Sequence, residues 1–122
     1  PTAGFAERVY FHQLRKGPDG KTIVAMVNRG FQGGRGIGYA LRFPRDQFPC
    51  FTEWKMMGQG LYVVGTEPGN VNPVARETLR RENRLPMIAP GERKKYELEF
   101  QVLTGAEEIR SVEKEIQSLQ EK

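Results

Sequence analysis

Cysteine and histidine are nearly absent from this chain of 122 residues, because each occurs once, as Cys50 and His12. One cysteine cannot form an intrachain disulfide, and it excludes a zinc site built on cysteines. No apolar run approaches the roughly 20 residues that a membrane-spanning helix requires. We therefore expect no bound metal and no membrane partner, and the single cysteine favours a cytoplasmic location.

Dense charge of one sign is also missing. The formal net charge is +4, and acidic residues interrupt the small basic clusters in the last third of the chain. Without a basic stripe interleaved with aromatic residues, nucleic acid is not an expected partner. The hydrophobic share of 38% and the charged share of 28% are typical of a soluble globular domain. The chain begins at Pro1 without methionine, and we expect a fragment, a processed product or a trimmed chain.

What the sequence does contain is a series of short strand patterns separated by turns. Five segments predict β-strands: 8–14, 22–28, 37–43, 60–66 and 95–103. The first two flank Pro18-Asp19-Gly20 and predict a hairpin. The last alternates most clearly, with Tyr96, Leu98, Phe100 and Val102 on one face. Segment 60–66 is apolar on both faces, which predicts a buried strand.

The remaining segments predict loops and helices. Residues 30–38 hold five glycines without the spacing of a dinucleotide-binding loop, which favours a hairpin loop. Residues 48–51 are turn-like, and 72–83 form either a short helix capped by Asn72 or an ordered loop. Thr104 and Glu107 form a capping-box pattern before a helix that we expect from about 105 to 120. Its apolar stripe should be buried against this sheet or a second chain, and it consists of Ile109, Val112, Ile116 and Leu119.

These patterns predict an all-β fold, an antiparallel β-sandwich with a C-terminal helix. We expect residues 1–104 to form the β-sandwich portion and 105–122 an amphipathic helix packed on it or on a partner. Because the edges of such a sheet must be covered or paired, the expected protein partners are a missing upstream half or a second copy of the chain.

Three stretches resemble one known family. They read Phe-Thr-Glu-Trp-Lys-Met-Met-Gly at 51–58, Gly-Leu-Tyr-Val-Val-Gly-Thr-Glu-Pro-Gly-Asn at 60–70, and Leu-Pro-Met-Ile-Ala-Pro-Gly-Glu at 85–92. Together with Glu-Arg-Val-Tyr-Phe-His at 7–12, they resemble the C-terminal half of an uncharacterised aldose-1-epimerase-like family in the galactose-mutarotase superfamily. The resemblance extends from residue 7 to about 109. It implies that the chain is less than half of a larger β-supersandwich with a carbohydrate cleft on one face.

The resemblance also implies a chemistry. Mutarotases of the superfamily interconvert the anomers of free aldoses without a cofactor. A glutamate takes the proton of the anomeric hydroxyl, a histidine protonates the ring oxygen, and the ring opens and recloses. Glu67 matches the glutamate, because it follows an apolar strand and precedes a proline. A general base works best with a pKa near the working pH, and partial desolvation raises the pKa of a carboxylic acid. The alternative for Glu67 is a turn carboxylate that accepts backbone hydrogen bonds near Asn70.

The other candidates also have two interpretations. His12 is either a second catalytic residue in the cleft or a structural histidine. Trp54 and Lys55 either line the cleft, with the indole stacked on a pyranose and the ammonium donating to hydroxyls, or form part of the core and surface. Asn70 and Arg76 either bind sugar hydroxyls or a carboxylate, or serve as a turn cap and a surface charge.

The leading hypothesis is an aldose 1-epimerase-like protein or fragment that acts on a small free sugar. The rivals are a non-catalytic carbohydrate-binding module on the same fold and a structural or partner-binding β-sandwich. The resemblance implies two catalytic histidines, and this chain has one. We therefore expect it to bind sugar while it loses most of the rate enhancement.

Overall fold

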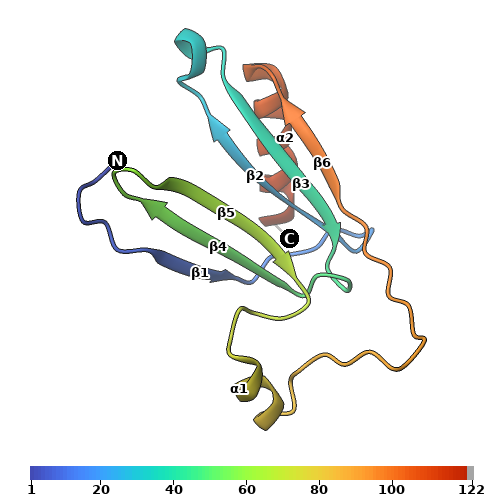
Figure 1. The fold of residues 1–122 in the computed structure, drawn as a ribbon. Helices are drawn as coiled ribbons and strands as arrows, with labels where there is room; N and C mark the ends of the chain where they lie inside the picture. Colours follow the sequence, from blue (N-terminus) through green and yellow to red (C-terminus); the bar gives the residue numbers. More distant parts are fainter. Residues whose placement is uncertain (121–122) are drawn as a thin grey trace. The chain divides into compact units, whose positions relative to one another are not determined.

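The computed structural model describes residues 1–120, and that part of the chain is mostly β (Figure 1). The strands are β1 (Arg8–His12), β2 (Lys21–Asn28), β3 (Ile37–Pro44), β4 (Cys50–Met57), β5 (Tyr62–Gly69) and β6 (Glu99–Leu103). The helices are the 3-10 turn η1 (Phe31–Gly34), α1 (Arg76–Arg81) and α2 (Ala106–Gln120). Two antiparallel three-stranded sheets and the C-terminal helix α2 confirm the predicted class, since they are consistent with an all-β sandwich that ends in a helix. Residues 121–122 of the predicted helix lie outside the described residues.

The chain folds as two compact units, each with its own sheet. Unit 1 comprises Pro1–Leu14 and Phe48–Lys95, and unit 2 comprises Arg15–Gln47 and Tyr96–Lys122. The sheet of unit 1 has the order β1-β4-β5, and the sheet of unit 2 has the order β2-β3-β6. The division of the chain predicted at residues 104 and 105 stays a prediction.

The predicted hairpin between the first two strands is wrong. β1 pairs with β4 along its whole length, from Arg8 opposite Lys55 to His12 opposite Phe51, and β2 pairs with β3. The turn itself forms, because Gly17 N–H donates to the carbonyl of Lys21 at 2.8 Å and Gly20 N–H to that of Gly17 at 3.0 Å. Turn chemistry reverses the chain locally, but it does not select the partner of a strand.

The partner that sequence reasoning missed is β4. Its first residues follow Pro49, and their turn-like composition concealed a strand of eight residues with two aromatic side chains. β4 and β5 form a hairpin in which Met57 lies opposite Tyr62 and Cys50 opposite Gly69. β4 is therefore the central strand of unit 1, and its two faces define the two surfaces of that sheet.

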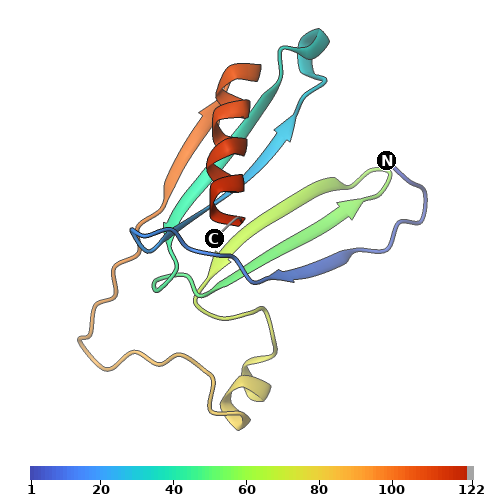
Figure 2. The same ribbon diagram turned by 180° about the vertical axis from the view of Figure 1, so that it is seen from behind.

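In unit 2, helix α2 packs on one face of the sheet. Ile109 and Val112 of α2 are buried, and Ile116 and Leu119 are partly buried against the same cluster. Their partners in the sheet are Ile23, Ala40 and Leu103. The predicted burial of the helical stripe is confirmed, and Figure 2 shows α2 lying along the sheet.

The glycine-rich loop between β2 and β3 closes over the first turn of α2. Gly36 has a φ of +80°, and a Cβ atom there would lie 2.8 Å from Cδ1 of Ile109. Glycine is needed at this position for its backbone conformation and for the close approach of the helix. The predicted hairpin loop is confirmed.

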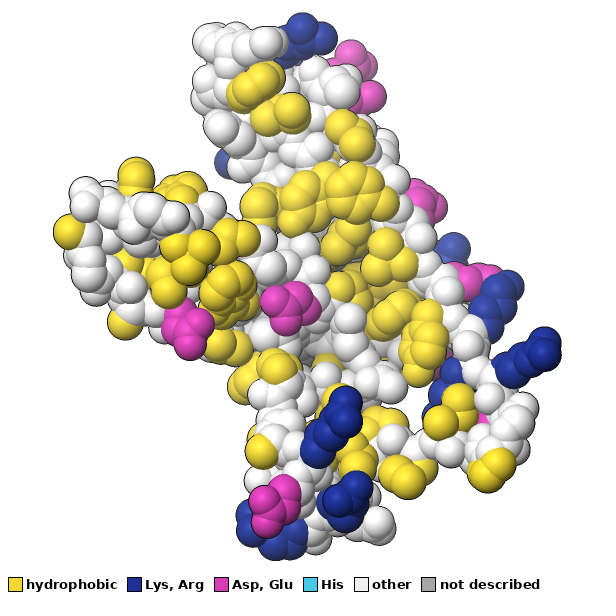
Figure 3. Space-filling view, viewed as in Figure 1, with side chains coloured by type: hydrophobic (Ala, Val, Ile, Leu, Met, Phe, Trp, Pro, Cys, Tyr) yellow, Lys and Arg dark blue, Asp and Glu magenta, His cyan; other side chains and the backbone are white. Residues whose placement is uncertain are grey.

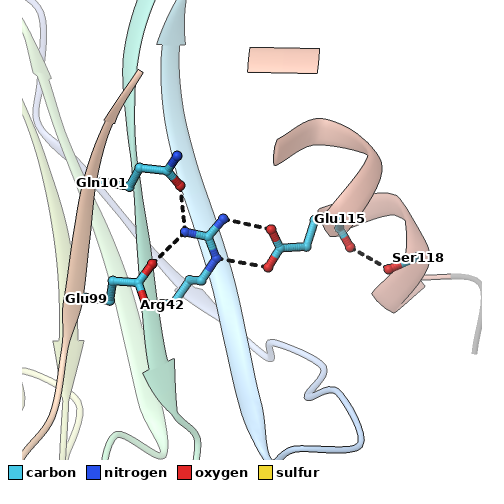
Figure 4. A network of polar contacts seen from close by, with 5 residues as sticks. All are labelled: Arg42, Glu99, Gln101, Glu115 and Ser118. Atoms are coloured by element: carbon cyan, nitrogen blue, oxygen red, sulfur yellow. Dashed lines mark hydrogen bonds and ion pairs between the residues drawn. The ribbon is translucent and has the colours of Figure 1, made fainter. Parts of the chain in front are cut away.

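A polar network ties the same helix to the sheet (Figure 4). Arg42 of β3 donates to both carboxylate oxygens of Glu115 in α2, at 2.9 and 2.7 Å. It also donates to Glu99 at 2.9 Å and to Gln101 at 2.7 Å, both in β6. The hydrogen bonds and charges of Glu115 and Glu99 raise the pKa of Arg42, and those of Arg42 lower the pKa of Glu115. The polar face of β6 is thus turned toward α2.

The apolar face of β6 is turned away from α2. Phe100 stacks on Tyr39 of β3 with ring centroids 5.1 Å apart, yet Phe100 is 59% exposed and Val102 57% exposed. Figure 3 shows hydrophobic side chains gathered over this face of the sheet. The alternation predicted for this segment is correct, although β6 starts at Glu99 and only its polar face and Leu103 pack against the helix side.

Helix starts differ from prediction by a few residues. α1 begins at Arg76 because Ala75, with ψ of 130°, is not helical. Asn72 is not the N-cap of this helix but lies in a turn, where its carbonyl accepts a hydrogen bond from Val74 N–H at 2.8 Å. At the start of α2 the backbone N–H of Thr104 donates to Glu108, at 2.6 Å, in place of Glu107. Within residues 1–120, no helix is long and apolar enough to cross a membrane.

Candidate functional site

One face of the unit 1 sheet combines an aromatic ring with carboxylates, and we call it the Trp54 face. In the register of the sheet, Trp54 of β4 lies opposite Val9 of β1 and Gly65 of β5. Directly opposed residues share a face of a sheet, and so do residues two apart along a strand. The Trp54 face therefore also carries Phe11 and Glu67.

The carboxylate of Glu67 lies over Gly65, the residue opposite Trp54. A methyl group at Gly65 would collide with the Glu67 carboxylate, so this carboxylate occupies the space over Gly65, directly opposite Trp54. The indole N–H of Trp54 donates to Oε2 of Glu7 at 2.7 Å. The half-buried Trp54 ring thus shares its sheet face with Glu67, and its hydrogen bond to Glu7 holds its orientation.

Glu67 lies within a strand and not in a turn. β5 continues to Gly69, so the predicted strand end at residue 66 is three residues short. Glu67 is opposite Thr52, and its side chain is exposed. The carboxylate is therefore presented to solvent by a regular strand.

The opposite face of the same sheet holds His12 and Lys55, and we call it the His12 face. Nε2 of His12 lies 3.2 Å from Oε2 of Glu53, and Nζ of Lys55 lies 2.9 Å from Oε1 of Glu53. The ammonium of Lys55 also sits 5.7 Å from the ring centroid of Tyr10, and the His12 ring contacts the edge of Phe51. The side chain of Glu53 is only 23% exposed, and it joins the two predicted site residues.

Electrostatics define the state of this cluster. The hydrogen bond from Lys55, followed by its charge and the hydrogen bond with His12, lowers the pKa of Glu53. The same hydrogen bond to Glu53 raises the pKa of Lys55. An ionised carboxylate only accepts hydrogen bonds, so the contact with Glu53 places a proton on Nε2 of His12.

The register separates the predicted candidates into two groups. Glu67 and Trp54 are together on one face, whereas His12 and Lys55 are together on the other. Trp54 and Lys55 are consecutive in β4, and consecutive residues of a strand point to opposite faces. Asn70 follows the end of β5, and Arg76 is the first residue of α1; both are exposed.

Sequence reasoning missed Glu7 and Glu53. The signal was present, because a strand over 50–57 puts Glu53 and Lys55 on one face by alternation. That signal could be used only after β4 had been recognised as a strand. Glu7 lies outside any strand, and only the fold brings it to Trp54, 47 residues away.

In the described part of the chain, neither a metal-binding cluster nor the pocket of unit 2 joins the predicted site residues. Among residues 1–120 there is no cluster of three or more His, Cys, Asp or Glu side chains that could hold a metal ion. Unit 2 has a pocket of about 300 Å³ between the glycine-rich loop and α2, whose charged lining is Arg29, Arg110 and Glu113. Arg29 and Glu113 form an ion pair, and the pocket includes none of the predicted site residues.

The fold and the site define a β-sheet protein that presents an aromatic ring and two carboxylates on one sheet face. The model of the family described as "Domain of unknown function (DUF4432)" matches residues 1–102, so the chain belongs to this family. No curated protein and no solved structure matches the chain.

Proposed function

We propose that this chain is a carbohydrate-binding protein or fragment of the aldose 1-epimerase type, and that free sugars bind on the Trp54 face. One observation carries the proposal: the Trp54 ring, which is hydrogen-bonded to Glu7, shares a sheet face with the carboxylate of Glu67, which lies over the directly opposed residue Gly65. The resemblance of residues 51–58, 60–70 and 85–92 to the aldose-1-epimerase-like family supports it, because Glu67 matches the catalytic glutamate by motif. We also propose a cytoplasmic location, which the single cysteine supports.

The chemistry of a pyranose suits this arrangement. One side of the ring is lined by C–H groups and can stack on an indole, while the hydroxyl groups at the rim donate to carboxylates. The hydrogen bond from Trp54 to Glu7 fixes the ring plane before sugar arrives, which lowers the entropy lost on binding. Glu67 is exposed and forms no ion pair with any of the described residues. Its carboxylate can therefore accept the proton of the anomeric hydroxyl.

Catalysis needs an acid as well as a base. His12 lies on the other face of the sheet, so it cannot protonate the ring oxygen of a sugar that Glu67 deprotonates. One positioned base contributes typically about 10²–10⁴-fold to a rate. We therefore propose that the chain by itself binds aldoses and accelerates anomer exchange weakly, and that full activity requires an acid from outside the described residues. The reaction requires no cofactor.

The test compares two isosteric substitutions on opposite faces. Anomer exchange of glucose and galactose is measured by NMR exchange spectroscopy, and binding is followed by chemical shifts, including that of the Trp54 indole N–H. We expect both sugars to shift the Trp54 signal. Glu67→Gln keeps the shape of the side chain and removes the base, so it should return anomer exchange to the uncatalysed rate. Glu53→Gln makes the same change on the His12 face and should leave exchange and binding unaltered.

Two results separate the alternatives. Sugar-induced shifts at Trp54 with no acceleration by the wild type would establish the rival function, a non-catalytic carbohydrate-binding module. Shifts that avoid both Trp54 and Glu67, or an accelerated rate that survives Glu67→Gln, would refute the assignment of the site.

A structural or partner-binding role is the second candidate, and a specific observation favours it. Leu98, Phe100 and Val102 are 46%, 59% and 57% exposed on the sheet face of unit 2 that α2 does not cover. An apolar face of this kind is typical of an interaction surface. We propose a second copy of the chain as the partner, with a missing upstream half as the alternative occupant.

A further inference from the structure

The positive charge of this protein is concentrated in one segment. Residues 76–95 contain seven Lys and Arg and three Glu, a balance of +4, which equals the formal net charge of the whole chain. The other 102 residues hold twelve basic and twelve acidic side chains and are neutral. All of the segment belongs to unit 1, the unit that carries the Trp54 face.

Most of this charge is not neutralised locally. Arg84 pairs with Glu82 at 2.8 Å, and Lys94 lies 3.9 Å from Glu92. The side chains of the other arginines of the segment are exposed and make no ion pair or hydrogen bond with any residue of the described chain: Arg76, Arg80, Arg81 and Arg93. Three of them are on α1, whose buried residue Leu79 anchors the helix. The result is a helix of unit 1 with a cluster of free guanidinium groups, and Figure 3 shows basic side chains gathered over it.

The chain connects this helix directly to the strand of Glu67. β5 ends at Gly69, two residues after Glu67, and α1 begins at Arg76. Seven Cα steps at about 3.6 Å each limit the distance from Gly69 to Arg76 to roughly 25 Å. Figures 1 and 2 both show α1 beyond the Gly69 end of β5. The arginine cluster thus lies past the end of the sheet at which the candidate base is found.

We propose that the sugars recognised by this protein carry an anionic group, a phosphate or a carboxylate, which the arginines of α1 attract and bind. This inference rests on the proposed function, because it assumes that the sugar ring lies on the Trp54 face. Guanidinium groups bind phosphate and carboxylate with two parallel hydrogen bonds, and they bind neutral hydroxyl groups far less strongly. Three free guanidinium groups on α1 would contribute nothing to the recognition of neutral aldoses.

The experiment compares sugars that share a ring and differ in charge. Dissociation constants are measured by NMR titration for glucose, glucose 6-phosphate and glucuronate, with inorganic phosphate as the anion without a sugar. In 10 mM NaCl the Debye length is about 30 Å, so the whole segment acts on the ligand, whereas at 150 mM it is about 8 Å. We expect at least one anionic sugar to bind about tenfold or more tightly than glucose at low salt, with a smaller ratio at 150 mM. The two anionic sugars show whether phosphate or carboxylate is preferred.

Two double variants remove the same amount of charge from different places. R80Q/R81Q removes two free guanidinium groups from α1 and should bring the affinity for the anionic sugar close to that for glucose. R110Q/K114Q removes two exposed cations from α2 in unit 2 and should preserve the preference. R76Q is a third variant, at the first residue of α1, and should reduce the preference in the same direction. Far-UV circular dichroism of each variant verifies that the sheets are intact.

The outcomes distinguish this inference from the function on which it rests. If glucose shifts Trp54 and the anionic sugars bind no more tightly, the charge inference is overturned and the proposed function stands. Equal affinity for inorganic phosphate and glucose 6-phosphate, or an equal loss in both double variants, also overturns it, because the sugar or the place of the charge would be irrelevant. If no sugar of either kind shifts Trp54, the proposed function itself fails.

Discussion

Replacing Arg42 by Met should destabilise the protein by about 2 kcal/mol, because Arg42 joins β3, β6 and α2. Its side chain is 19% exposed and makes four hydrogen bonds, two to Glu115 and one each to Glu99 and Gln101. Methionine keeps much of the aliphatic stem and removes the guanidinium. The change in the free energy of unfolding therefore reflects mainly the loss of the polar contacts.

The magnitude follows from the exposure of each partner. Glu115 is 45% exposed, so screening by solvent reduces its bidentate ion pair from roughly 1.5–3 kcal/mol to about 1 kcal/mol. The part-buried hydrogen bond to Gln101 contributes about 1 kcal/mol more. Glu99 is 60% exposed and adds little. The measurement is the free energy of unfolding from urea titration at pH 7, followed by circular dichroism.

A second ion pair on the same helix provides the control. Arg29 pairs with Glu113 of α2, but the Arg29 side chain is 71% exposed. Arg29→Met should therefore change the free energy of unfolding by less than about 0.5 kcal/mol. A loss for Arg42→Met no larger than that of Arg29→Met would refute the reasoning that this network holds the helix on the sheet.

The same network predicts a dependence on pH. Arg42 lowers the pKa of Glu115 in the folded state below its ordinary value of 4.5, first through hydrogen bonds and then through charge. A carboxyl with a lowered folded-state pKa stabilises the protein above the unfolded pKa and loses this contribution as pH falls through the folded pKa. Stability of the wild type should thus fall as pH drops below 4.5, and Arg42→Met should flatten this part of the curve.

Two further predictions concern close packing and association. Gly33→Ala should lower the free energy of unfolding by about 1 kcal/mol through its positive φ alone. Gly36→Ala should lower it by at least about 1 kcal/mol more, because the added methyl group meets Ile109. Equal midpoints of the two variants in urea titration would contradict this. Light scattering at micromolar concentration should show a dimer of the wild type. Phe100→Ser should disrupt this dimer, whereas Phe31→Ser, on the η1 turn, should leave it intact. A monomeric wild type would exclude self-association.

Local patterns predicted the elements well where residues act on their immediate neighbours. Strand-like composition and turn signals located five of the six strands in the described residues, and the period of Ile109, Val112, Ile116 and Leu119 predicted the buried stripe of α2. The glycine-rich stretch was correctly predicted as a loop between strands. These features depend on backbone preferences and on the periodicity of one segment, so they can be read without knowing the partner.

Pairing could not be predicted in the same way. β4 was missed because Pro49 and its apolar neighbours resemble a turn, and without β4 the turn after the first strand made β2 its expected partner. A strand pairs with whichever segment buries its faces best, and that competition involves residues about 40 positions apart, such as His12 and Glu53. The alternation of β6 likewise does not reveal which of its two faces lies against the helix. Only the fold turned the polar face toward α2, where it contacts Arg42.

For the candidate site, the sequence by itself determined the residue types: one glutamate before a proline, one tryptophan, one histidine and a basic segment. The tertiary structure alone decided which of them meet. The register of β1, β4 and β5 put Glu67 on the same face as Trp54 and sent His12 and Lys55 to the opposite face with Glu53, while the segment before β1 brought Glu7 to the Trp54 indole. The physical reason is the two-residue period of a strand, since a shift of one position in register would exchange the two faces and bring a different set of side chains together.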